Sequence, residues 1–221
     1  MTGSAEKAPS GKLFVRGSDE FSRVLSFSDG LFAIAATLLV VGIAVPTIDD
    51  ANSVGDLADA LNDQSEEFVS FVISFAVIGR YWVAHHQMFS LMRGFDRGFV
   101  SINLIYLGFI AFVPFPTALL GEYFDNPLAV GVYAAAVGIV SGLEVLLLRH
   151  ARRADLLTKE MPDDVYRWGT ITSTMPVILF AASIPVAFIG SGWAVGVWLL
   201  NAPVGFYANS HAPDGVEEYF S

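Results

Sequence analysis

A cluster of charged and hydroxylated side chains opens the first long apolar segment of the chain. Arg23, Ser26, Ser28 and Asp29 precede residues 31–46, which are apolar enough to cross a bilayer. A charged group at the start of a membrane span is costly unless it has partners. The cluster therefore marks a candidate functional site, and the surrounding elements decide which kind.

Candidate partners for the Asp29 carboxylate are donor side chains in two later apolar segments. Trp82 and His85 are three residues apart and share a helical face, and Asn103 lies in the following segment. These residue types favour a structural hydrogen-bond network of Ser28, Asp29, Trp82, His85 and Asn103. The rival interpretation is a proton relay, because chains of Asp and His move protons in pumps.

The composition places the chain among membrane proteins that cross the bilayer several times. Of its 221 residues 54% are hydrophobic, and the mean hydropathy is +0.56. The absence of cysteine excludes disulfides and thiolate metal sites, and the net charge of −10 argues against nucleic-acid binding. Adjacent histidines in a helix diverge by about 100°, so His85 and His86 predict no metal site and no cofactor.

Six apolar windows have the length that a transmembrane helix needs. They cover residues 24–46, 68–92, 99–121, 127–149, 168–190 and 192–209. The predicted fold is therefore all-α, with five helices and a re-entrant hairpin as the alternative. Residues 1–22 and 210–221 are expected to be tails on either side of a membrane domain at 23–209.

The basic residues predict the orientation in the membrane. If six helices alternate, all but one of them fall on a single side: Lys7, Lys12, Arg16, Arg23, Arg93, Arg97, Arg149, Arg152, Arg153, Lys159 and Arg167. Basic loops face the cytoplasm, so both termini are expected there, in a multi-pass protein of a prokaryotic plasma membrane. Arg80 is the exception inside a window, and it either pairs with Glu144 or extends toward the surface.

The opposite side is acidic. Its first loop carries seven carboxylates, namely Asp49, Asp50, Asp56, Asp59, Asp63, Glu66 and Glu67. Residues 54–61 within it form either a short amphipathic helix or part of a solvated loop. A negative vestibule of this kind would concentrate cations near the membrane.

An apolar stripe follows the polar cluster along the first window. At about 100° per residue, Ile34, Leu38 and Val41 fall within about 40° of one line, with Thr37 near its edge and Asp29 about 140° away. Periodicity alone favours lipid contact or ordinary packing for this stripe. The sequence holds no GxSxG, HExxH or phosphate-binding Gly-rich loop, so no enzyme is indicated, and no TVGYG-type carbonyl filter of potassium channels.

Three sequence motifs resemble the prokaryotic branch of the transmembrane protein 175 family of potassium channels. The first is Arg23-x-x-x-Phe27-Ser28-Asp29 followed by Gly-Leu-Phe-Ala-Ile-Ala-Ala-Thr. The second runs from Trp82 through the two histidines to Phe89, and the third combines Asn103-Leu with Pro-Phe-Pro at 114–116. The resemblance covers residues 23–123, while the second half agrees only in hydropathy.

The resemblance implies a homotetramer of six-helix subunits in the lipid bilayer, with the first helix of each lining a potassium-selective, leak-type pore. Ile34 would form the main hydrophobic constriction, Leu38 and Val41 further rings, and Thr37 a hydroxyl layer linked to potassium preference. Other monovalent cations are possible permeants.

The resemblance also implies that Arg23, Phe27, Ser28 and Asp29 hold the first helix against its neighbours. Helical projection instead puts Arg23 within about 20° of Ile34, at the cytoplasmic mouth. Two other functions stay open: a proton-conducting or proton-coupled transporter that uses Asp29 and His85, and a membrane scaffold that transports nothing.

Overall fold

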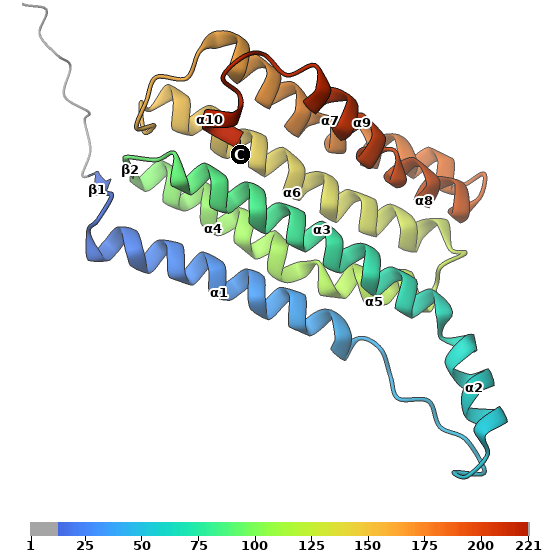
Figure 1. Ribbon diagram of the computed structural model, residues 1–221. Coiled ribbons are helices and arrows are strands. Elements are labelled where there is room, and N and C mark those ends of the chain that lie inside the picture. The colour runs from blue at the N-terminus through green and yellow to red at the C-terminus, as the bar shows by residue number, and fades with distance from the viewer. Residues whose placement is uncertain (1–12, 221) are drawn as a thin grey trace, which may run out of the picture.

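Helices make up nearly all of the computed structural model, which describes residues 13–220 (Figure 1). The elements are β1 (Phe14–Val15), α1 (Asp19–Val41), α2 (Val54–Asp63), α3 (Ser65–Ser90), β2 (Gly94–Phe95), α4 (Arg97–Phe112), α5 (Pro114–Glu122), α6 (Pro127–Arg153), α7 (Asp163–Ala187), α8 (Ser191–Leu199), α9 (Asn201–Ser210) and α10 (Glu217–Phe220). Residues 1–12 of the expected N-terminal tail, with Lys7 and Lys12, lie outside the described residues, as does Ser221.

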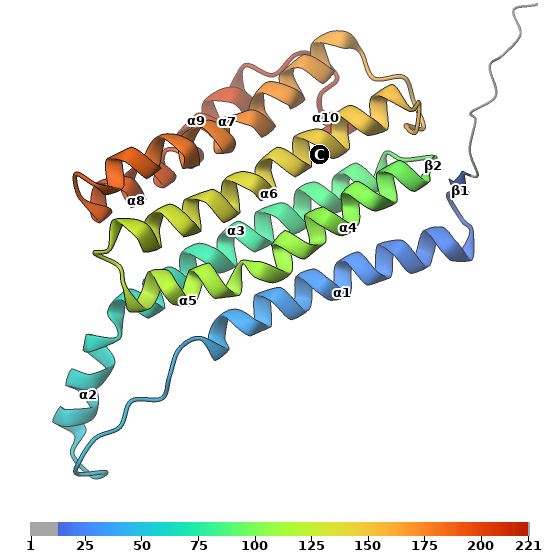
Figure 2. The same ribbon diagram turned by 180° about the vertical axis from the view of Figure 1, so that it is seen from behind.

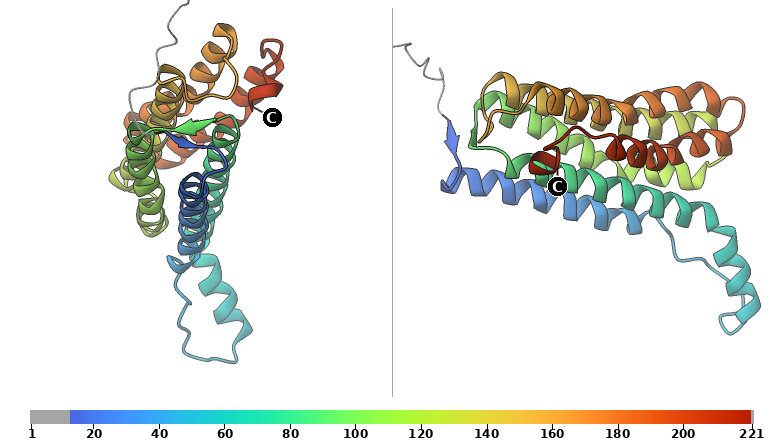
Figure 3. Two further views of the ribbon diagram at one scale, coloured as in Figure 1. Left: turned by 90° about the vertical axis from the view of Figure 1, so that its left-hand side faces the viewer. Right: turned by 45° about the horizontal axis from the view of Figure 1, so that its top comes forward.

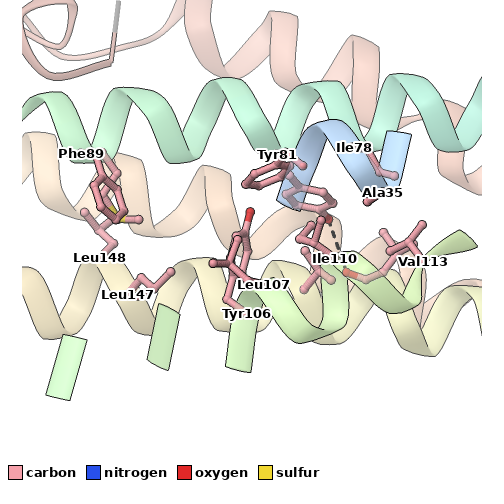
Figure 4. Packing of buried hydrophobic residues seen from close by; sticks show 14 of the residues in the cluster. Ala35, Ile78, Tyr81, Phe89, Tyr106, Leu107, Ile110, Val113, Leu147 and Leu148 are labelled. Atoms are coloured by element: carbon pink, nitrogen blue, oxygen red, sulfur yellow. Dashed lines mark hydrogen bonds between the residues drawn. The ribbon is translucent and has the colours of Figure 1, made fainter. Parts of the chain in front are cut away.

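The long helices run side by side, with α1 at one edge of the bundle and α7 to α9 at the other (Figures 1 and 2). Helix α6 lies between them and is the most enclosed, because 56% of its apolar window is buried, compared with 22% for α1 and for α7. Aromatic and aliphatic side chains fill the space beside it, among them Tyr106, Leu107, Ile110 and Leu147 (Figure 4). This core holds α1 on one side and the α7–α9 arm on the other.

Five helical stretches within the described residues are long and apolar enough to cross a membrane: α1, α3, α4 with α5, α6 and α7. The sixth expected window instead forms two short helices, α8 and α9, that meet at Leu200. Pro203 has no N–H to donate to the carbonyl of Leu199, which breaks the helix at this turn. Pro114 similarly separates α4 from α5.

The two strands and two interhelical loops gather at one end of the bundle (Figure 3). Phe14 pairs with Phe95 in the antiparallel β1–β2 ribbon, so residues 14–22 of the expected tail form a strand and the start of α1. The loop before α4 also bonds the loop before α7, since the Arg93 N–H donates to the Leu156 carbonyl at 2.9 Å. The basic residues of the described loops lie at this end, which we call the basic end.

Helix α2 projects from the opposite end of the bundle (Figure 1). The sequence left a helix and a solvated loop as alternatives for this segment, and the structure has the helix, capped by the Ser53 side chain on the Asp56 N–H. None of its residues is buried. The acidic segment is thus an ordered extension of α3 into solvent.

Candidate functional site

Three of the expected network residues meet where α1, α3 and α4 pack together. The Asn103 amide donates to the Ser28 hydroxyl at 3.1 Å, and its oxygen lies 2.9 Å from Nε2 of His85. All three side chains are buried. Because the amide nitrogen of Asn103 donates to Ser28, the amide oxygen is free to accept a hydrogen bond. Nε2 of His85 is then the donor of that bond.

The second ring nitrogen of His85 has no hydrogen-bond partner in the described chain. In the neutral ring with a proton on Nε2, this nitrogen needs no acceptor, whereas an imidazolium would bury an unpaired N–H. Phe89 stacks on the ring with a centroid distance of 4.3 Å, which leaves little room for water. The geometry thus favours a neutral His85 in a structural role.

Asp29 forms a separate unit with Trp82. The indole N–H of Trp82 donates to the carboxylate at 3.0 Å, and the indole is 42% exposed. Successive helical residues diverge by about 100°, so Asp29 points away from the buried pocket of Ser28. No hydrogen bond among the described residues joins this pair to His85. The expected single network is therefore divided into two separate units.

Arg23 and Phe27 do not join either unit. Both are exposed, Phe27 to 55%, and Arg23 has no ion pair within residues 13–220. Their positions lie within about 20° of the line through Ile34, on the side of α1 that faces away from α3 and α4. Their role in holding α1 stays a prediction, and the exposed position of Arg23 agrees with its helical projection.

The same exposed side of α1 carries the four expected pore residues. Ile34, Leu38 and Val41 are 58%, 45% and 74% exposed, and Thr37 is exposed with its hydroxyl bonded to the Ile34 carbonyl at 2.8 Å. We call Arg23, Phe27, Ile34, Thr37, Leu38 and Val41 the α1 row. All of its residues are exposed, while Ala35 on the opposite face is completely buried.

Arg80 and Glu144, which the sequence left open, pair with each other at 3.6 Å. Glu144 is nearly enclosed by α6 and its neighbours, whereas the Arg80 side chain is half exposed. Within residues 13–220, no three His, Asp or Glu side chains form a group that could hold a metal ion.

A second buried hydroxyl network escaped the sequence reasoning. Thr117 of α5 donates to Ser74 of α3 at 2.8 Å, and Ser74 donates to Tyr133 of α6 at 3.0 Å. Tyr81 bonds Ser141 about two turns away. The available signal was the presence of hydroxyl residues inside apolar windows, where a polar group needs a partner.

Comparison with known proteins finds a matching family model and two similar bacterial channels. The family model described as "Endosomal/lysosomal potassium channel TMEM175" matches residues 23–114. A potassium channel of Chamaesiphon minutus is 36% identical over 189 residues, 80% of this chain and 89% of that protein. A potassium channel of Streptomyces collinus is 45% identical over 122 residues, 55% of this chain but only 58% of that protein.

A human relative and two solved structures extend the comparison. The human endosomal/lysosomal proton channel TMEM175 is 36% identical over 97 residues, 42% of this chain and 19% of its own. The crystal structure of a lysosomal potassium-selective channel TMEM175 homologue from Chamaesiphon minutus matches with a TM-score of 0.69 and 34% identity over 87% of this chain and all of that one. A variant of the potassium channel MtTMEM175 shares the fold, with a TM-score of 0.59 and 17% identity over 93% and 98% of the two chains.

Proposed function

The chain belongs to the TMEM175 family, and on that premise we propose that it is a potassium-selective, leak-type channel. The support comes from two bacterial relatives that are named potassium channels and from the likeness to a potassium-selective homologue. The chain is then a channel subunit rather than an enzyme.

The observation that carries the proposal is the uncovered α1 row. Its residues line one side of α1 from the basic end to Val41, while the other side is fixed by the Ser28–Asn103–His85 contacts. Lipid would cover a purely apolar row, but the charged Arg23 at one end is a poor lipid-facing residue. Four copies with α1 at the centre would turn the row toward a shared axis.

The remaining architecture follows from this assembly. Helices α8 and α9 together return along α7 and serve as the sixth crossing (Figure 1). The basic end would face the cytoplasm of a prokaryotic cell, and α2 with its carboxylates would stand at the outer mouth. These carboxylates would raise the local cation concentration, an effect that salt screens.

In this assembly, four Ile34 side chains form the narrowest ring. Branched apolar side chains exclude water when the ring is narrow and pass hydrated ions when α1 tilts or rotates. Leu38 and Val41 would form wider rings toward the outside. Thr37 would supply hydroxyl groups that favour potassium.

The decisive experiment measures potassium flux into liposomes for Ile34→Asn. A polar ring wets more easily, so we expect higher flux and weaker closure than in the wild type. Val40→Asn is the matched control, because Val40 is also exposed but lies about 120° from Ile34 around the helix. Unchanged flux in Ile34→Asn, or an equal rise in Val40→Asn, would refute the constriction.

A proton pathway through Asp29 and His85 is the second candidate, and the vertebrate relatives named proton channels are its support. The separate hydrogen bonds of the two residues argue against a relay between them. We expect reversal potentials to follow the potassium gradient rather than the pH gradient. His85→Ala should weaken the assembled protein, whereas loss of flux with the assembly intact would favour the relay.

A further inference from the structure

A large cavity lies on the side of the bundle remote from α1. It has a volume of about 770 Å³ and is walled by α3, α6, α7, α8 and α9. This volume lies in the range of small-molecule sites, about 300–1,000 Å³. Because α7 to α9 form the edge opposite α1 in Figures 1 and 2, the cavity is separate from the α1 row.

The charges of the two ionic groups that line the cavity cancel each other. Arg80 and Glu144 both line it and lie 3.6 Å apart, so their summed charge is zero. An isolated ion in a low-dielectric site carries a large desolvation cost. A ligand with a charged head would leave a net charge there, whereas a neutral polar head would not.

Polar side chains without partners mark where such a head would bind. Gln87, Ser173 and Asn209 line the cavity, and their side chains form no hydrogen bond among residues 13–220. All three lie in the half of the cavity nearer the basic end. Amide and hydroxyl groups can both donate to and accept from a ligand hydroxyl.

The other half of the cavity is apolar. From Arg80 toward the α2 end, its walls carry aliphatic and aromatic groups from α3, α7 and α8, among them Val72, Ala76, Phe180, Val195 and Trp198. The cavity is therefore amphipathic along its length. We propose that it binds a neutral amphiphile, with a hydroxylated head at Ser173, Gln87 and Asn209 and a single acyl chain in the apolar half.

The test is photolabelling of the assembled protein in liposomes with a monoacylglycerol that carries a diazirine in its chain. Adducts are located by mass spectrometry of peptides. We expect them on α3 and α7 to α9. The fatty acid and the hydrocarbon with the same diazirine chain should label these helices about tenfold less, because they lack a neutral hydroxyl head.

A matched pair of glycines tests the position of the ligand. Gly205 lines the cavity, while Gly192 does not line it, and a Cβ at either one meets open space. Gly205→Leu should reduce labelling several-fold and Gly192→Leu should leave it unchanged. Ser173→Ala should reduce labelling by the monoacylglycerol but not by the hydrocarbon.

The proposal would be overturned by equal labelling by the three probes, by labelling spread evenly over all lipid-facing helices, or by no effect of Gly205→Leu. Absence of any adduct on the cavity helices, as expected if a neighbouring subunit fills it, would also overturn it. None of these readouts measures ion flux, so they stand apart from the channel experiment.

Discussion

The two faces of α1 differ in both chemistry and surroundings. The inner face carries Ser28, Phe32 and Ala35, all at most 2% exposed, and Ser28 is held by the amide of Asn103. The α1 row on the other face is mostly apolar, and its side chains are exposed in the described chain. In a membrane protein, buried polar groups thus mark the side by which a helix is held. In the proposed assembly, the apolar side faces the ion path.

The sharpest test compares adjacent residues on the two faces. Ala35→Asn would overfill a packed site and bury an amide without partners, so we expect a loss of about 3 kcal/mol or more in unfolding free energy. Ile34→Asn should change that free energy by less than about 0.5 kcal/mol. Unfolding of the purified protein in mixed micelles, followed by circular dichroism, measures both. Equal losses would contradict the assignment of the two faces.

Removing the amide that joins three helices should have the next largest effect. Asn103→Leu leaves Ser28 and His85 without their partner in a buried site, and we expect a loss of about 2 kcal/mol in the same unfolding measurement. Ser101→Ala is the control on α4, because Ser101 is exposed and bonds only its own helix. A loss in Asn103→Leu no larger than in this control would show that the contact does not fix α1.

The Asp29–Trp82 unit should matter less, because it is partly exposed. Trp82→Phe keeps an aromatic ring but removes the donor to Asp29, so a loss of at most about 1 kcal/mol is expected. Asp29→Asn keeps an acceptor for the indole N–H, so its loss of unfolding free energy should be smaller than that of Trp82→Phe. An effect as large as that of Asn103→Leu would place Asp29 among the essential contacts of the inner face.

The smallest expected effect concerns pH and the start of α4, the helix that carries Asn103. Burial raises the pKa of the Asp96 carboxyl, but the hydrogen bond from the Phe99 N–H and the contact with His150 outweigh it, so this pKa lies below its ordinary value. A lowered pKa stabilises the fold above the ordinary pKa of Asp, and this contribution is lost as pH falls through the folded value.

Unfolding curves of wild type and Asp96→Asn should therefore differ in their pH dependence below about pH 4. We expect the difference in unfolding free energy to be less than about 1 kcal/mol, because Asp96 is one-third exposed and asparagine also caps helices. Parallel curves through the acid range would show that Asp96 contributes no such stabilisation.

Hydropathy predicted α1, α3, α6 and α7 to within five residues at each end, because each is one long and mainly apolar run. It did not predict the break between α8 and α9, since a hydropathy window does not register the missing N–H of Pro203. The Ser28, His85 and Asn103 contacts were expected from the need of buried polar groups for partners.

Other features depend on how helices are arranged around the bundle, which periodicity does not encode. The pairing of Arg80 with Glu144 is one example, and the Ser74–Tyr133 bond is another. The resemblance assigns Arg23 and Phe27 to holding α1, and that role stays a prediction although both lie in the exposed α1 row. The roles of Ile34, Thr37, Leu38 and Val41 stay predictions that the flux experiments address.

The hydrogen bonds between α3 and α6 join segments that are synthesised at different times. Ser74 and Tyr81 of α3 find partners that lie 59 and 60 residues later in the chain. At ribosomal rates of about 5–20 residues per second, these hydroxyls wait roughly 3–12 s for α6 to emerge. During that interval, α1, α3 and the α4–α5 pair are in the bilayer with an incomplete core. The nascent chain is then most open to capture by chaperones or proteases.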